Sequence, residues 1–224
     1  MDMQMILEFL TQLRQNNDLE WMREHKAFYQ EAKEGFEQVV GSLIDRISIF
    51  DPSVCGHQPK ELIFRLNRDT RFSADKSPYQ PAFRAHISAG GRAPVPVGYF
   101  VCITPGASIL GGGIFATQFS QATALIRQYI DSHSAEFLEI ISDPEFTGSF
   151  EVLGEKLKNV PKGYDKEHPA AEYLKHKSWA IEYPIPDELW MDGFLEKASG
   201  IFYKMKPFND YLNKALVGFE MPKR

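Results

Sequence analysis

The 224-residue sequence predicts a single α+β domain in which a central antiparallel β-meander is flanked by N-terminal and C-terminal helices. Two patterns predict this class. Apolar residues recur at helical spacing near both ends of the chain, whereas between them they alternate at every second position, as in strands. Strands that follow one another through short turns favour antiparallel pairing. We therefore expect a helical segment over residues 1–50, a mainly β segment over 60–118, and a mainly helical segment with one further strand over 119–224.

The N-terminal segment contains three expected helical stretches. The first has an apolar face made by Ile6, Phe9, Leu10 and Leu13. Asp18 is a suitable N-cap for the second, because its side-chain oxygen can accept hydrogen bonds from free backbone N–H groups of the first turn. The apolar stripe that starts at Trp21 continues to Ile47, with a break expected near Gly35, and Asp51-Pro52 ends the helical part.

The residues of the first expected strand divide between two faces. Phe83, Ala85 and Ile87 share one face, whereas Arg84 and His86 share the other. A further short strand through residues 62–66 is an open alternative at the start of this segment.

The uncharged stretch over residues 93–126 is interpreted as buried sheet. A membrane-spanning helix needs about 20 mainly apolar residues in a row, but prolines and glycines interrupt this stretch. A strand is expected over 97–103, followed by a turn at Pro105-Gly106 and a return strand over 107–115. Within the return strand, the run Gly111–Gly113 indicates a close crossing of chains in preference to a ligand contact.

Helical patterns return in the last segment. Helices are expected over residues 121–130 and 135–141, and a short one over 170–175. Trp179, Ile181 and Tyr183 alternate as one more strand. A helix beginning at Asp187 and a last helix from Pro207 complete the expected elements.

Composition limits the compartment and the partners. The net charge is −5, which argues against bulk attraction to nucleic acid or anionic lipid. Two cysteines, Cys55 and Cys102, make neither a disulfide framework nor a metal-binding spacing, and the N-terminus lacks the features of a signal peptide. We expect a cytoplasmic protein that does not insert in a membrane. No sequence motif identifies a cofactor, and the sequence leaves the oligomeric state open.

A cationic stretch interrupts this acidic chain. The sequence "FRLNRDTRFSADKSPYQPAFRAHI", residues 64–87, contains four arginines and one lysine between aromatic residues. Guanidinium groups match carboxylate and phosphate oxygens two at a time. The preferred hypothesis is therefore a binding site for a small phosphate- or carboxylate-bearing ligand. Its predicted binding residues are Arg68, Arg71, Lys76 and Arg84, with Phe72 or Tyr79 as an apolar wall and His86 as an extension.

The same stretch has a structural interpretation. Asp69 and Asp75 could neutralise its arginines in a salt-bridge network over residues 65–84 that ties the loop to the sheet. The sequence does not decide between the two readings.

Two further function classes stay open. A hydrolase or transferase would use Ser73 or His86, since Ser73-Ala74-Asp75-Lys76 matches the S-x-x-K pattern of penicillin-recognising enzymes. The K-T-G strand of those enzymes is missing from the sequence, and Pro78 would interrupt the helix that the pattern needs. The other class is a non-catalytic interaction module that binds a protein or a single strand of nucleic acid, although the acidic remainder of the chain opposes nucleic acid. The histidine spacing argues against a structural zinc site.

The motifs together resemble a known family. The stretches "FRLNRDTRFSADKSPYQ", "NNDLEWMREHKAFY", "GYFVCITPGASILGGGIF" and "GEKLKNVPKGYDKEHPAAEYLKHKS" are similar to the family known as domain of unknown function 2461. The resemblance implies one soluble α+β domain and brings no catalytic residue. Two positions depart from the family pattern: Met22 replaces an aromatic residue, and Gln80 replaces a lysine, which removes a cation from the predicted site.

Overall fold

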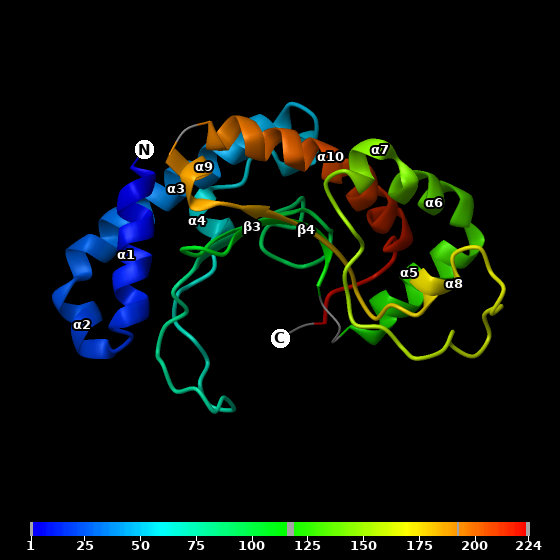
Figure 1. Cartoon of the computed structure of the whole chain (residues 1–224), viewed down its shortest axis with the longest axis horizontal. Helices are drawn as coiled ribbons and strands as arrows, with labels where there is room; N and C mark the ends of the chain where they lie inside the picture. The colour runs from blue at the N-terminus through cyan, green and yellow to red at the C-terminus, as the bar shows by residue number, and fades with distance from the viewer. Residues whose placement is uncertain (1, 116–118, 192, 223–224) are drawn as a thin grey trace.

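The computed structural model describes residues 2–115, 119–191 and 193–222. These residues form a four-stranded antiparallel sheet, in the order β1 (Phe83–Ile87), β2 (Tyr99–Ile103), β3 (Ser108–Ile114) and β4 (Trp179–Ile185) (Figure 1). The predicted α+β class with a central antiparallel sheet is confirmed. Residues 116–118, at the end of the predicted β segment, lie outside the described residues.

The N-terminal helices are α1 (Met3–Gln15), α2 (Leu19–Glu24) and α3 (Lys26–Ser48). Asp18 caps α2 as predicted, with its carboxylate accepting from the backbone N–H groups of Glu20 and Trp21. The expected break near Gly35 is wrong, because the chain breaks at His25 and Gly35 lies inside α3. A Cβ atom on Gly35 would lie 3.2 Å from Ile6, so this glycine lets α1 approach α3 closely.

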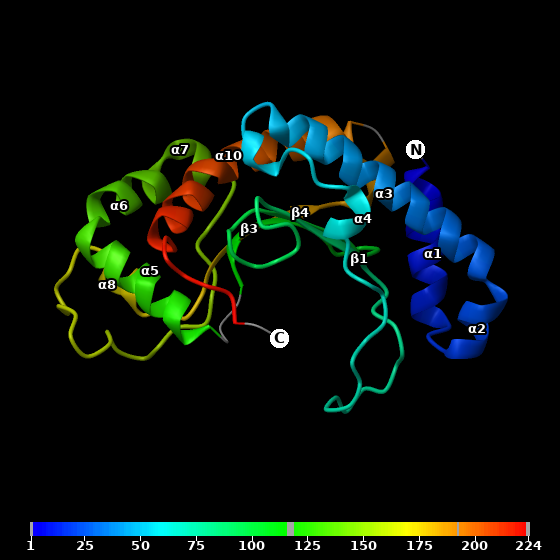
Figure 2. The same ribbon diagram turned by 180° about the vertical axis from the view of Figure 1, so that it is seen from behind.

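Two short elements, η1 (Pro52–Val54) and α4 (Pro59–Leu62), lead to the sheet. The alternative of an additional strand through residues 62–66 is reduced to one isolated bridge between Ile63 and Ala85. Residues 65–80, which we call the arm, then leave the body of the molecule and return to β1 (Figures 1 and 2).

Six helices follow β3 in the described residues. They are α5 (Ser120–Ser132), α6 (Ser134–Ser142), α7 (Pro144–Thr147), α8 (Ala171–Leu174), α9 (Asp187–Met191) and α10 (Phe194–Ala215). The last helix begins thirteen residues before Pro207, where the sequence predicted its start. Phe194, Ala198, Ile201 and Met205 form a buried stripe ahead of the proline, so tertiary packing holds one continuous helix across it.

One face of the sheet is covered by α3 and α10 (Figure 1). Phe36 of α3 stacks on Phe83 of β1 with ring centroids 5.2 Å apart, and Phe202 of α10 packs edge-on against Tyr99 of β2 at 5.3 Å. The core lies in this layer. The opposite face turns away from both helices, between the arm on one side and the α5–α8 group on the other (Figure 2).

The glycine run joins α10 to the covered face. The Cβ atom of a residue at position 112 would lie 3.0 Å from Asn209 Oδ1 and 3.2 Å from Met205 Sδ. Gly113 has a φ of +77°, and its backbone N–H donates to Asn209 Oδ1 at 2.8 Å. The predicted close crossing of chains is therefore present at Gly112 and Gly113.

No helix in the described ranges is both long enough and apolar enough to cross a membrane.

Candidate functional site

The sheet face opposite α3 and α10, which we call the open face, carries side chains in two aligned rows. Antiparallel pairing places His86, Phe100, Gly111 and Glu182 side by side across all four strands. The second row is Arg84, Cys102, Ile109 and Pro184. The alternation that buries Phe83, Ala85 and Ile87 under α3 thus places the charged and polar residues of the strands together on the other side.

A hollow of about 740 Å³ lies on the open face. Its floor is the sheet, and its walls come from the segment before the arm, the loop between β1 and β2, and the C-terminal tail. The lining includes Arg84, His86, Arg92 and Glu182, together with four phenylalanines: Phe64, Phe100, Phe115 and Phe119. A volume of this size, mainly apolar and with few polar groups, is typical of small-molecule sites.

Two arginines in the hollow flank the ring of Phe64. The guanidinium carbon of Arg84 lies 5.7 Å from the ring centroid and that of Arg92 lies 5.8 Å from it. Arg92 donates to the Ile63 carbonyl at 2.8 Å. Arg84 forms no ion pair with any described residue, and its buried Nε atom has no hydrogen-bond partner among them. Arg84 is therefore a half-buried cation that lines the hollow and has no carboxylate partner among the described residues.

His86 is a buried neutral base beside Arg84. Its side chain is 8% exposed, and burial lowers its pKa to about 4, against a weaker opposite effect of the Ala93 backbone. Its Nδ1 atom has no hydrogen-bond partner in the described part of the chain. At neutral pH the imidazole carries no charge, so it can contribute a hydrogen bond to a ligand but does not add to the cationic field.

Cys102 lies between the charges of the open face. Burial raises the pKa of its thiol, while the charge of Arg84 lowers it and that of Glu182 raises it. The sulfur lies 3.4 Å from Thr104 Oγ1. Because burial dominates, the thiol is protonated at neutral pH and is a poor nucleophile.

The arm holds the other predicted cations, and each has a partner within the arm. Arg68 pairs with Asp75 and donates to Ser73 Oγ at 3.4 Å. Arg71 makes a forked ion pair with Asp69, with the shortest contact at 2.6 Å. The Lys76 ammonium donates to the Thr70 carbonyl at 2.9 Å. Hydrogen bonds from Arg71 lower the pKa of Asp69, and hydrogen bonds from Ser77 and then Arg68 lower the pKa of Asp75, because these donors favour the ionised carboxylate.

The two predicted aromatic wall residues lie apart. Phe72 is 95% exposed near the tip of the arm, with the Arg71 guanidinium 5.8 Å from its ring centroid. Tyr79 is buried at the base of the arm, where Asn17 bonds both to its backbone N–H, at 3.1 Å, and to its carbonyl, at 2.9 Å. Of the predicted binding residues, Arg84 and His86 line the hollow together, whereas Arg68, Arg71, Lys76, Phe72 and Tyr79 belong to the arm.

Ser73 occupies an irregular part of the arm and accepts from Arg68. The helix that S-x-x-K chemistry needs is not formed there, and Lys76 bonds to Thr70 and not to Ser73. No contact in the described structure joins Ser73 to His86. A role for either residue in a hydrolase or transferase stays a prediction.

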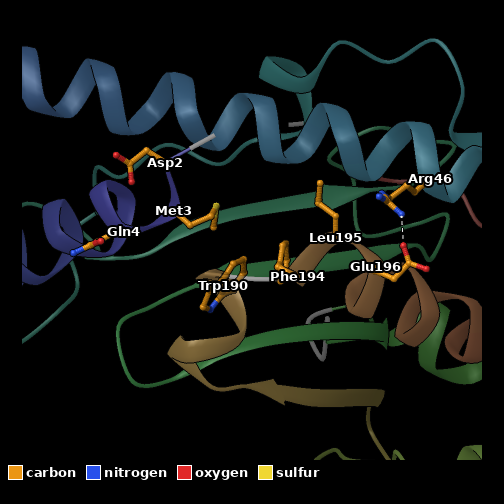
Figure 3. A pocket seen from close by; sticks show the side chains of 9 residues that line it. Asp2, Met3, Gln4, Arg46, Trp190, Phe194, Leu195 and Glu196 are labelled. Atoms are coloured by element: carbon orange, nitrogen blue, oxygen red, sulfur yellow. Dashed lines mark hydrogen bonds and ion pairs between the residues drawn. The ribbon is translucent and has the colours of Figure 1, made fainter.

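A second hollow of about 720 Å³ lies beside the start of α1 (Figure 3). Three charged residues line it. Arg46 and Glu196 pair with each other at 3.2 Å, and Asp2 accepts a hydrogen bond from the Met5 backbone N–H at 3.0 Å. The Trp190 Nε1 atom is buried without a partner in the described ranges, but it is a donor on a ring stacked against Phe194. Because Arg46 is already paired with Glu196, this hollow is less suited to an anionic ligand than the open face.

Sequence reasoning missed most of the residues that line the hollow. Phe100 and Glu182 follow from the same alternation that identified Arg84 and His86, extended to the neighbouring strands. Phe64 begins the cationic stretch and Arg92 follows its end, and only the fold brings both beside Arg84. Phe119 lies between elements, where no periodicity places it.

Fold and site define an α+β protein with a ligand-sized hollow on the open face of an antiparallel sheet. The chain belongs to the family described as conserved hypothetical protein (DUF2461), whose family model matches residues 5–211. The resemblance read from the motifs is thereby confirmed. No curated protein and no solved structure matches the chain. The family description names no activity.

Proposed function

We propose that the hollow on the open face binds a small ligand with a carboxylate or phosphate group and an apolar, ring-bearing body. The observation that carries the proposal is Arg84, a half-buried cation without a carboxylate partner in the described structure, in a hollow lined by four phenylalanines. Taking a charge out of water costs free energy unless a partner compensates it. A ligand anion would supply that partner.

The composition of the walls supports the apolar part of the ligand. Phe64, Phe100 and Phe115 form a connected aromatic group, with centroids 6.4 Å apart in the first pair and 6.1 Å in the second. Rings packed at this spacing can accept a further ring edge-on or stacked. Gly111, next to Phe100 in the same row, has no side chain, and the tip of the Phe115 ring lies 3.3 Å from where its Cβ atom would be.

The arm is the alternative location for an anion, as the sequence first suggested. Arg68 and Arg71 are paired with Asp75 and Asp69, so a ligand at these two arginines would have to compete with internal carboxylates. Arg71 is 77% exposed, and exposed charges of this kind bind anions weakly. We therefore place the anion at Arg84 and not at Arg68, Arg71 and Lys76.

Titration calorimetry with biphenylcarboxylate and naphthyl phosphate tests the proposal. We expect dissociation constants in the micromolar range and a loss of about tenfold or more in Arg84→Gln. Gly111→Leu, which places a side chain in the middle of the hollow, should weaken binding similarly. Arg71→Gln is the matched control, because it removes one arginine charge from the arm and should leave affinity unchanged.

Circular dichroism and thermal unfolding of each variant show whether the fold is kept. No binding of either probe below about 1 mM to the wild-type protein would contradict the proposal. Binding that depends on Arg71 and not on Arg84 would move the site to the arm.

A further inference from the structure

The open face presents two opposite charges at its two edges. Arg84 lies in β1 and Glu182 in β4, with two strands between them. At about 4.8 Å per strand, the outer strands are roughly 14 Å apart. Both residues line the same hollow, so one ligand can lie across the sheet and reach both.

Neither charge has a partner among the described residues. Arg84 and Glu182 form no ion pair with each other or with a neighbour, and Glu182 makes no side-chain hydrogen bond there. Both side chains are half-buried. The thiol of Cys102 lies between them, and its pKa is lowered by the charge of Arg84 and raised by that of Glu182. This agrees with both charges facing a common space.

The residues between the two charges are apolar or lack side chains. Phe100 and Gly111 fill the two inner positions of the row that ends at Glu182, and Cys102 and Ile109 fill those of the row that begins at Arg84. The hollow is therefore positive at the β1 edge, apolar in the middle and negative at the β4 edge. A ligand whose only polar group is an anion would pair with Arg84, and its apolar part would then face the carboxylate of Glu182.

From this polarity we infer that the ligand is dipolar, with a carboxylate or phosphate at the Arg84 end and an amine or other hydrogen-bond donor at the Glu182 end, separated by an apolar ring system. This inference rests on the proposed function and specifies its ligand class. Glu182 then acts as the residue that selects dipolar ligands over simple anions, because an unpaired carboxylate disfavours a ligand without a donor.

A pair of probes separates the two ends. Biphenylcarboxylate carries only the anion, whereas its para-aminomethyl derivative carries an amine at the opposite end of the same two rings. For the wild-type protein we expect the aminomethyl probe to bind about tenfold more tightly, equivalent to roughly 1.4 kcal/mol. In Glu182→Gln the two probes should bind with equal affinity, while the affinity for biphenylcarboxylate stays the same or rises.

The controls distinguish this inference from the proposed function. Glu188→Gln removes an exposed carboxylate of α9 outside the hollow and should keep the preference for the aminomethyl probe. Equal affinities in the wild-type protein, or a preference that survives Glu182→Gln, would overturn the dipolar ligand and leave the anion site at Arg84 intact. Failure of both probes to bind the wild-type protein would overturn the proposed function and the inference together.

Discussion

His86 shows how the environment of one residue changes its chemistry. Burial lowers its pKa to about 4 from an ordinary 6.5, so between these pH values the unfolded chain binds a proton that the folded protein does not. Stability must then fall as pH falls through this window. At about 1.4 kcal/mol per pH unit, His86 should cost roughly 2 kcal/mol between pH 6.5 and 5. Urea unfolding at the two pH values should show that His86→Gln loses this part of the pH dependence.

A second histidine provides the control. Burial also lowers the pKa of His176, which stacks between Tyr173 and Trp179. His176 therefore contributes to the dependence of stability on pH in the wild-type protein and in His86→Gln alike. His176→Gln should remove a separate part of the slope, additive with that of His86. The carboxyl groups of Asp69 and Asp75, whose pKa values are lowered, lose their contribution at lower pH. An unchanged slope in His86→Gln would mean that the imidazole is not buried in solution.

Also at the residue scale, the arm marks the limit of sequence reasoning. The sequence showed arginines and aspartates within a few positions of one another, and it allowed either a binding site or a network. The structure pairs Arg68 with Asp75 and Arg71 with Asp69, at mostly exposed positions. Pairing partners depend on side-chain directions in an irregular segment, which no periodicity encodes. By contrast, Arg84 and His86 lie in a strand, and simple alternation predicted their common face correctly.

At the scale of elements, the adjacent glycines of β3 have different roles that substitution should separate. Gly113 has a φ of +77°, and a Cβ atom there would lie 2.2 Å from the Trp179 carbonyl oxygen of β4. Gly113→Ala must therefore strain the backbone and push two strands apart, at a cost of about 2–4 kcal/mol. At Gly111 the nearest atom would be the tip of the Phe115 ring, at 3.3 Å, which can move aside.

Thermal unfolding measures the difference. For a domain of this size we expect Gly113→Ala to lower the melting temperature by roughly 4–16 °C and Gly111→Ala to change it by less than about 4 °C. Equal losses in the two variants would show that the β3–β4 pairing is looser than the structure indicates. The sequence identified the run as a close crossing, but it could not assign each glycine to a face, because that depends on the register with β4.

Helix boundaries reveal another limit of local patterns. Pro207 and Gly35 are the residues at which propensity favours an end or a break. Both lie inside long helices, because the buried stripes of α10 and α3 continue across them and pack on the sheet and on α1. The spacing of apolar residues predicted that helices exist in these regions. Where the helices end depends on packing against residues that are distant in sequence.

At the scale of the whole molecule, we expect no nucleic-acid binding, because of how charge is distributed. The chain has a net charge of −5, and the arm that concentrates arginines also contains Asp69 and Asp75, which pair with two of them. Few cations are left to replace the counterions of a phosphate backbone. The aromatic residues of the hollow, such as Phe64 and Phe100, face a compact space and not an extended groove.

Fluorescence anisotropy with a labelled thymidine oligonucleotide of about 20 nucleotides tests this conclusion. We expect no binding at about 0.15 M salt, and at low salt at most weak binding with a shallow dependence on salt concentration. A dissociation constant below about 10 µM at 0.15 M salt, with a steep salt dependence, would instead make the protein a single-strand binder. In that case two variants would locate the contact. Weaker binding in Arg71→Gln would place the oligonucleotide at the arm, and weaker binding in Arg84→Gln would place it across the open face.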